Sequence, residues 1–477
     1  MGSYRNLYLL EDGQPFTTGR IGGCGVEVAP KQDSGGWKVL TREREIRLAG
    51  ERWRRKLARK GKRRDPLPDR KEVGLASHDR YRSVILSQYQ QFKPFNQRLE
   101  VEPRTFKLPK VFSITENPIE TLKMYREIVE FARSTRTPRV VVDHRPVKVM
   151  GLAADSVLAV LLKEMSLENR ERQRARIRGF KANDTAVRKM MDEIGCVRVM
   201  HTGISEDIRL ELGSGAKVFR HQNRKNLQVD PLTLDPLSAV AVEFADHLNI
   251  CLASAGKKLT DSGRQQLLGY VGEIMANAQE HSSLAEWTIA GYLDQDNATL
   301  TYRCSIFSFG QSFFETFDRL GRDTVAYEQI EPYIEAHERS GLFNKYWRRE
   351  DLVAVLALQG YISSKQVAEG DRGQGTVDFI RFFQTVWKDC VATGPRPVMS
   401  VLTGRTLIRF DGTYEMVPSG SQKRMTIAFN DANNLLERPD PDAVKALDEG
   451  FPGVVISISF QMTNAVLEEV DGTDNEN

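Results

Sequence analysis

Closely spaced cysteines are missing from this chain of 477 residues. A Cys-x-x-Cys pair would indicate a zinc site or a redox motif, and a dense cysteine set would indicate a disulfide framework. Neither pattern occurs, because the five cysteines are widely scattered. They are Cys24, Cys196, Cys251, Cys304 and Cys390. The cysteine content therefore favours a reducing, cytoplasmic compartment.

Long apolar runs are missing too. Hydrophobic residues make up 40% of the chain, but no uninterrupted run approaches the roughly 18 residues that a membrane span requires. The first residues also lack the apolar stretch of a secretory signal. We therefore expect a soluble, cytoplasmic protein with no membrane partner. No nuclease, protease or metal-cluster motif is recognisable, so an effector activity is expected in a separate partner protein.

Acidic residues are scarce in one stretch near the N-terminus. The net charge is only +4, but residues 41–64 hold twelve Lys/Arg against three Glu. The helical pattern at 42–64 is either a solvated helix with long basic stems or a patch that neutralises an anionic partner. DNA, RNA, an acidic protein and the chain's own acidic tail at 467–477 are all compatible with such a patch.

Turn-forming and Pro-rich stretches divide the chain into five predicted parts. They are a basic, partly irregular region at 1–105, a small α/β domain at 108–205, a connection at 206–234, a second α/β domain at 235–466 and a frayed acidic tail at 467–477.

Strand and helix patterns alternate in the first α/β part. Short apolar runs predict strands, and longer amphipathic stretches predict helices. The predicted strands are 111–114, 139–143, 176–179 and 196–200, and the predicted helices are 119–131, 152–167 and 185–194. This alternation implies a layer with at least some parallel strands.

The same part resembles the STAS-like domains of anti-sigma-factor antagonists. The resemblance rests on the strand Val140–Asp143, the turn at Met150-Gly151 and the helix that contains Asp155 and Ser156. That family has a phosphorylated serine near the start of such a helix, which would make Ser156 a phospho-acceptor. The family's Asp-Ser-Ser-Gly pattern is absent, so a serine on the helix surface is the default prediction.

A row of polar residues marks a predicted helix from Arg264 to His281. Glu273, Asn277 and His281 are spaced four residues apart, so a helix places them along one edge. The apolar residues that fall on a different face, expected to pack against a sheet, are Leu267, Val271, Ile274, Met275 and Ala278.

Further elements surround this helix in a fixed order. A helix at 239–247 precedes it. The elements that follow it are strands at 286–293 and 298–307, a loop at Ser308–Ser312, a helix at 351–361, a glycine-rich loop at Gly370–Gly375, a helix at 376–386 and strands at 398–402, 406–410 and 453–459.

This order resembles the GHKL ATP-binding family, which includes gyrase-, Hsp90- and MutL-type ATPases and the histidine and anti-sigma-factor kinases. The resemblance covers about residues 235–465. It implies an α/β sandwich with a mixed, mostly antiparallel sheet, and ATP and Mg²⁺ as cofactors.

The resemblance assigns roles to the helical row. Asn277 would coordinate the Mg²⁺ that bridges the nucleotide phosphates, and Glu273 would orient or deprotonate the attacking water or hydroxyl. His281 corresponds to a position near the phosphates in the kinase branch. A helix-end histidine that caps carbonyls is the alternative.

The second glycine loop would close over the phosphates. Gly373 and Gly375 would let backbone amides approach them, and the helix that begins near Thr376 would add its positive end. Lys365 and Arg372 are candidate phosphate ligands, with a solvated side chain as the alternative for Arg372.

The first glycine loop departs from the family pattern. The family expects Asp-x-Gly-x-Gly, in which the aspartate accepts the adenine amino group. Here Gly310 is kept, and Ser308 stands in place of the aspartate. A serine hydroxyl can accept a hydrogen bond but brings no charge, so adenine selectivity is in question.

Three functions are compatible with these patterns. The first is a slow ATPase whose lid closure regulates partner or nucleic-acid contacts, in bacterial antiviral defence or stress signalling by family analogy. The second is a serine-protein kinase that acts on a STAS-like domain. The third is a non-enzymatic nucleic-acid-binding module with a degenerate nucleotide pocket. A homodimer is among the open assembly states.

Overall fold

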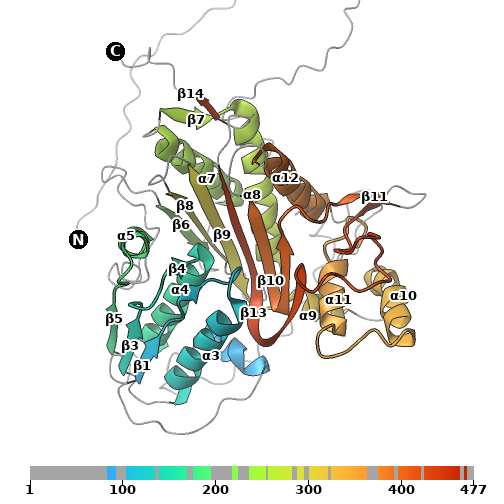
Figure 1. The fold of residues 1–477 in the computed structure, drawn as a ribbon, viewed down its shortest axis with the longest axis horizontal. Coiled ribbons are helices and arrows are strands. Elements are labelled where there is room, and N and C mark those ends of the chain that lie inside the picture. The colour runs from blue at the N-terminus through green and yellow to red at the C-terminus, as the bar shows by residue number, and fades with distance from the viewer. Residues whose placement is uncertain are drawn as a thin grey trace, which may run out of the picture. The chain divides into compact units, whose positions relative to one another are not determined.

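The computed structural model describes fourteen segments of the chain. They are residues 83–92, 104–134, 139–168, 176–194, 218–223, 236–253, 256–281, 287–294, 300–320, 324–362, 374–390, 396–419, 424–461 and 467–469. These segments form a mixed α/β protein with both parallel and antiparallel sheets (Figure 1). Within them, no helix is both long and apolar enough to cross a membrane.

Several predictions fall on residues outside these segments. They are the basic helix at 42–64, the strand at 196–200, and the part of the second glycine loop that carries Lys365, Arg372 and Gly373. These features therefore stay predictions.

The first α/β part contains a three-stranded, fully parallel sheet in the order β1-β3-β5. Its strands are β1 (Arg104–Lys107), β3 (Arg139–Asp143) and β5 (Arg176–Phe180). The helices of this part are α2 (Val84–Gln88), α3 (Pro118–Ser134), α4 (Leu152–Glu168) and α5 (Thr185–Ile194), with a 3₁₀ turn η1 (Tyr89–Gln91) and a short parallel pair, β2 (Val111–Phe112) and β4 (Val149–Met150). The predicted alternation and the predicted parallel strands are confirmed, whereas β1 was not predicted.

Helix α4 is buried around its circumference over residues 152–162, including the polar residues Asp155 and Ser156. It contacts α2, α3 and β5 as well as strands of the second part of the chain. A helix in such a position has no solvent face. Ser156 is consequently only 1% exposed, and the default prediction of a surface serine is wrong.

The second α/β part contains a five-stranded sheet in the order β10-β13-β9-β8-β6. Its strands are β6 (Val218–Asn223), β8 (Trp287–Asp294), β9 (Thr301–Phe309), β10 (Val398–Phe410) and β13 (Val444–Gln461), and every neighbouring pair is antiparallel. Strand β6 comes from the segment that was predicted to be a connection. That segment therefore supplies an edge strand.

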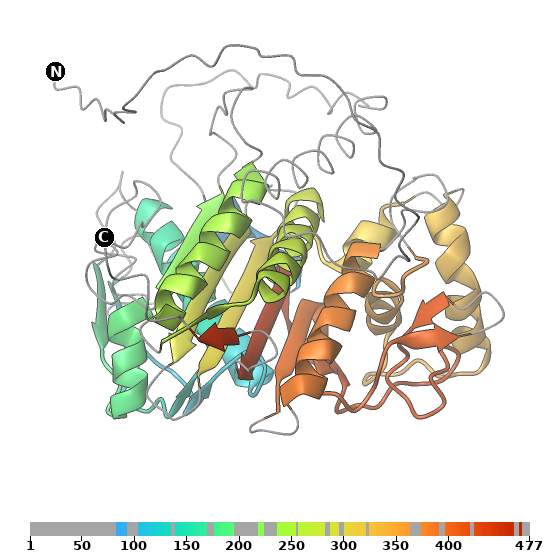
Figure 2. The same cartoon turned by 90° about the horizontal axis from the view of Figure 1, so that it is seen from above.

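Helices cover one face of this sheet: α7 (Pro236–Ala253), α8 (Asp261–His281) and α12 (Gln374–Cys390). Figure 2 shows them in front of the strands. Side chains alternate along β9, so Cys304 and Ile306 pack in the core beneath these helices. Phe307 and Phe309 face the other way and share a core with α3 and α4. The two predicted domains thus have a common core, and both lie within one compact unit that spans Thr41–Asn477.

Strand β10 is one continuous strand, although two strands at 398–402 and 406–410 were predicted. The interruption in the apolar pattern coincides with Gly404, which has φ 57° and lies at a shift in the register with β13. Glycine adopts this left-handed conformation without strain. The bulge therefore bends the strand instead of ending it.

The region between β9 and β13 holds further elements. They are α9 (Phe313–Asp318), α10 (Val325–Arg339), α11 (Arg349–Leu356), β11 (Val417–Ser419) and β12 (Arg424–Thr426). Helices α9 and α10 were not predicted, and α11 is shorter than the predicted helix at 351–361. Residues Leu467–Glu469 of the predicted frayed tail form β14, which pairs with β7 (Lys257–Leu259).

Candidate functional site

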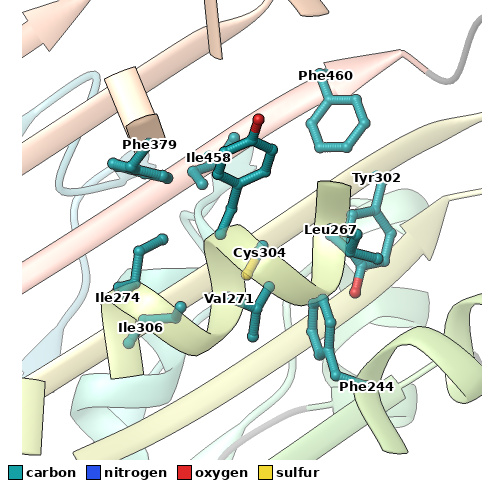
Figure 3. A pocket seen from close by; sticks show the side chains of 11 residues that line it. Phe244, Leu267, Val271, Ile274, Tyr302, Cys304, Ile306, Phe379, Ile458 and Phe460 are labelled. Atoms are coloured by element: carbon teal, nitrogen blue, oxygen red, sulfur yellow. The ribbon is translucent and has the colours of Figure 1, made fainter. Parts of the chain in front are cut away.

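Helix α8 lies along strand β9 and runs in the same direction. In Figure 3, Leu267, Val271 and Ile274 follow one another along the helix in the same direction as Tyr302, Cys304 and Ile306 along the strand. All of these side chains line one apolar cavity of about 20 Å³. The matching order of contacts along the helix and the strand defines which end of α8 meets which end of β9.

The cavity itself is not the predicted nucleotide site. Its other lining residues include Phe244, Phe379 and Phe460, and the described site residues Ser308, Gly310 and Thr376 are not among the residues that line it. Burial raises the pKa of the Cys304 thiol in its wall to about 12. A thiol in this state is a poor nucleophile, so the cavity belongs to the hydrophobic core.

The predicted polar row begins at the level of the cavity with Glu273 and continues beyond it with Asn277 and His281. Glu273 and Asn277 lie in the second half of the helix, and His281 is its last residue. Along the axis of α8, Asn277 and His281 lie about 5 and 10 Å beyond Ile274. Along β9, Ser308 and Gly310 lie about 7 and 13 Å beyond Ile306. The carboxyl-terminal half of the row is therefore level with the end of β9.

Ser308 lies inside β9 rather than in the predicted loop. It pairs with Trp287 on one side and Val454 on the other, and it is 4% exposed. The two-residue period of the strand puts it on the same face as Cys304 and Ile306, which is the face that α8 covers. Ser308 therefore lies on the sheet face that α8 covers, and the prediction that it belongs to a loop is wrong.

Backbone without side chains surrounds the end of β9. Gly310 has φ 135°, and its amide donates a hydrogen bond of 3.1 Å to the carbonyl oxygen of Pro452. Gly453 has φ 133°, and a β-carbon there would collide with the carbonyl oxygen of Ser308. Gly310 is buried, and Gly453 lets β13 approach the backbone of β9 closely. Both glycines have conformations that other residues avoid.

The first turn of α12 also approaches this region. Gly375 and Thr376 are the second and third residues of α12, which packs against α8. Phe379 reaches the cavity that Ile274 lines (Figure 3). Gly375 precedes Phe379 by about 6 Å of helix. The positive end of α12 thus lies within a few turns of the polar row.

The donor set fits Mg²⁺ only with help from a ligand. Among the described residues, no group of three or more His, Cys, Asp or Glu side chains could hold a metal ion. Asn277 can supply one hard oxygen, which suits Mg²⁺ when phosphate oxygens and water complete the octahedron. An ion at this place would therefore arrive with a nucleotide rather than reside in a protein cage.

The sequence patterns missed a buried polar network beside the first glycine loop. Arg348 Nε and Nη2 each donate a 3.0 Å hydrogen bond to the carboxylate of Asp351, and Thr406 Oγ1 donates one of 2.6 Å. Arg348 also donates to the carbonyl oxygens of Leu447 and Arg405. The network ties the start of α11 to β10 and β13, so it anchors the scaffold of the site. Arg348 and Asp351 are only three residues apart, but their partners Thr406, Arg405 and Leu447 are distant in sequence, so no motif marks the network.

Comparisons with known proteins add no family assignment. No protein-family model matches the chain, and no curated protein or solved structure is significantly similar to it.

Proposed function

We propose that this protein is a cytoplasmic Mg-ATP-binding protein of GHKL type that hydrolyses ATP slowly. In this proposal Asn277 coordinates Mg²⁺ between the phosphates, and Glu273 orients the attacking water and accepts its proton. Gly310 and Gly375 provide close backbone approach, and Ser308 meets the base. The part with α3 and α4 would be a STAS-like module fused to the nucleotide-binding part.

One observation carries this proposal. The parallel course of α8 and β9, seen in the order Val271, Ile274 along the helix and Cys304, Ile306 along the strand, supports a position of Asn277 and His281 level with Ser308 and Gly310. The two sequence motifs are separated by about thirty residues, and their convergence depends on the fold.

Titration of the whole protein with Mg-ATP, Mg-ADP and Mg-GTP by calorimetry tests the proposal. Asn277→Ala should weaken Mg-ATP binding by about tenfold or more, the scale at which losing a metal-site partner is felt. Gln279→Ala is the matched control, because it removes the same functional group from the same helix outside the row. Equal Mg-ATP affinity of Asn277→Ala and the wild type would refute the assignment.

The kinase alternative has no observation in its favour. A phospho-acceptor must reach the active site of its kinase, and the candidate Ser156 is 1% exposed within α4. Phosphate transferred to the protein from labelled ATP would still reveal such an activity.

A further inference from the structure

The parallel sheet of β1, β3 and β5 has one buried face and one exposed face. Phe106, Val140 and Val142 point into the core that α3 and α4 share. The side chains between them in sequence point the opposite way. The residues of this outer face that matter here are Thr105, Lys107, Arg139, Asp143, Arg178 and Phe180.

The outer face is open to solvent. Thr105, Lys107, Arg139 and Arg178 are exposed, and the Phe180 side chain is 47% exposed. Parallel sheets normally have both faces covered. An uncovered face with a large exposed aromatic ring is therefore a candidate binding surface.

The charge of this face is positive. Lys107, Arg139 and Arg178 contribute three cationic groups, and Lys107 and Arg178 form no salt bridge with any described residue. Asp143 is a carboxylate of the same face, but Arg145 neutralises it through two hydrogen bonds of 2.8 Å. The remaining positive charge suits a polyanion.

Phe180 and Arg145 form a cation–aromatic pair on this face, which we call the Phe180–Arg145 platform. The guanidinium carbon of Arg145 lies 4.3 Å from the centroid of the Phe180 ring. The paired hydrogen bonds to Asp143 fix the guanidinium plane and also satisfy its charge. A fixed stack of a ring and a guanidinium is the kind of surface on which unpaired bases stack. An acidic peptide would gain little from it.

We propose that this outer sheet face binds single-stranded nucleic acid, with phosphates at Lys107 and Arg178 and a base stacked on the Phe180–Arg145 platform. A flat sheet can present extended nucleotides to side chains of successive strands, as other sheet-based modules do. The proposal is independent of the nucleotide site, because it involves neither α8 nor the end of β9.

Fluorescence anisotropy with the full chain and a labelled 12-nucleotide oligothymidine or oligouridine tests the proposal. Phe180→Ala should weaken binding about fivefold or more, because a stacked base is lost. A Lys107→Glu/Arg178→Glu double variant should reduce the slope of log Kd against log salt by about 1.4, at roughly 0.7 per phosphate contact. Any sequence-independent binding by residues 41–64 remains in every variant, so ratios to the wild type isolate the sheet face.

Matched controls lie on other surfaces of the chain. Tyr346 is 69% exposed and carries Lys345 over its ring at 4.6 Å, so Tyr346→Ala removes a similar cation–aromatic pair. Lys445→Glu reverses an exposed charge on strand β13. Both controls should bind within twofold of the wild type, and circular dichroism should show all variants folded.

Three results would overturn the proposal. The first is that the sheet-face variants bind with the same affinity and the same salt slope as the wild type and the controls. Absence of binding by the wild type and all variants counts as this result too. The second is tighter binding of a duplex of the same length. The third is equal competition by polyglutamate of equal charge, which would identify an acidic protein as the partner.

Discussion

Ile274 of α8 and Ile306 of β9 lie side by side in the wall of one apolar cavity (Figure 3). This contact is the last of three that pair the helix with the strand in matching order. Beyond it, the helix continues into Asn277 and the strand into Ser308. The apolar core thereby sets the level of these polar groups along the helix and the strand, and each prediction about the proposed site depends on this alignment.

Replacing Glu273 separates hydrolysis from binding. Glu273→Ala should lower the ATPase rate by about 10² to 10⁴, the usual contribution of a positioned base, while Mg-ATP affinity stays within a few-fold. Glu280→Ala, on the same helix but outside the row, is the control and should keep the wild-type rate. Phosphate release under saturating Mg-ATP measures both. A Glu273→Ala rate equal to the wild-type rate would remove the catalytic assignment.

Replacing Ser308 tests the altered base-reading position. Ser308→Ala removes one neutral hydrogen-bonding group, which is worth about 1 kcal/mol, so the preference for ATP over GTP should fall about fivefold. Ser305→Ala is matched, because Ser305 is buried on the same strand and its odd position points to the opposite face. Competitive titration of the two nucleotides provides the measurement. An unchanged ATP/GTP ratio in Ser308→Ala would show that another group reads the base.

Local periodicity predicted the helices and strands that carry the site. The row on α8 and the apolar strands β8 and β9 follow from spacing alone, because each pattern is complete within about twenty residues. The alternation of side chains along β9 also predicts which face of the sheet Ser308 is on. Its membership of the strand was missed because Gly310 suggested that the loop begins earlier.

Features that depend on distant partners could not be predicted in this way. Strand β6 reads Val-Phe-Arg-His-Gln-Asn, a polar sequence that becomes a strand because it pairs with β8 at the sheet edge. The burial of α4 on all sides depends on its contacts with β8, β9 and β13, which lie far from it in sequence. The shared core of the two parts follows from such long-range packing.

Gly291 and Gly269 should respond to alanine in opposite directions. A β-carbon on Gly291 would collide with the hydroxyl of Tyr302 and lie 2.9 Å from the Phe244 ring, so Gly291→Ala should destabilise the fold by about 1–3 kcal/mol. Gly269 is an exposed position of α8 with open space around it. Gly269→Ala should stabilise by about 0.5–1 kcal/mol. Urea unfolding compares the two, and the same sign for both changes would contradict the packing around Tyr302.

Asp351 should be far more important for stability than a surface carboxylate. Its side chain is fully buried and accepts hydrogen bonds from Arg348 and Thr406. Asp351→Ala leaves the Arg348 charge without its main partner, which should cost about 3 kcal/mol or more. Glu415 pairs with Lys388 at 2.9 Å on the surface, and Glu415→Ala should cost less than about 1 kcal/mol. Similar midpoints of urea unfolding for the two variants would show that the network does not anchor α11.

His144 should make the protein sensitive to mild acid. It is 1% exposed at the end of β3, and burial lowers its pKa from 6.5 to about 4, against smaller opposing effects from the carbonyls of Val142 and Phe180 and from Asp143. Between pH 6.5 and pH 4 the unfolded chain binds a proton at this histidine that the folded chain does not. The free energy of unfolding should therefore fall across this window as the pH decreases, by up to about 3 kcal/mol from His144.

Comparison of His144→Phe with Val142→Ala isolates the titration of this histidine. His144→Phe cannot bind the proton in either the folded or the unfolded state. As the pH falls from 7 to 4, the free energy of unfolding of the wild type should therefore decrease by up to about 3 kcal/mol more than that of His144→Phe. Val142 is a buried apolar neighbour, and the deficit of Val142→Ala should stay constant over the same range. Urea unfolding at several pH values measures both differences. Parallel curves for wild type and His144→Phe would mean that the buried imidazole is protonated in the folded protein, and that its pKa is not lowered by burial.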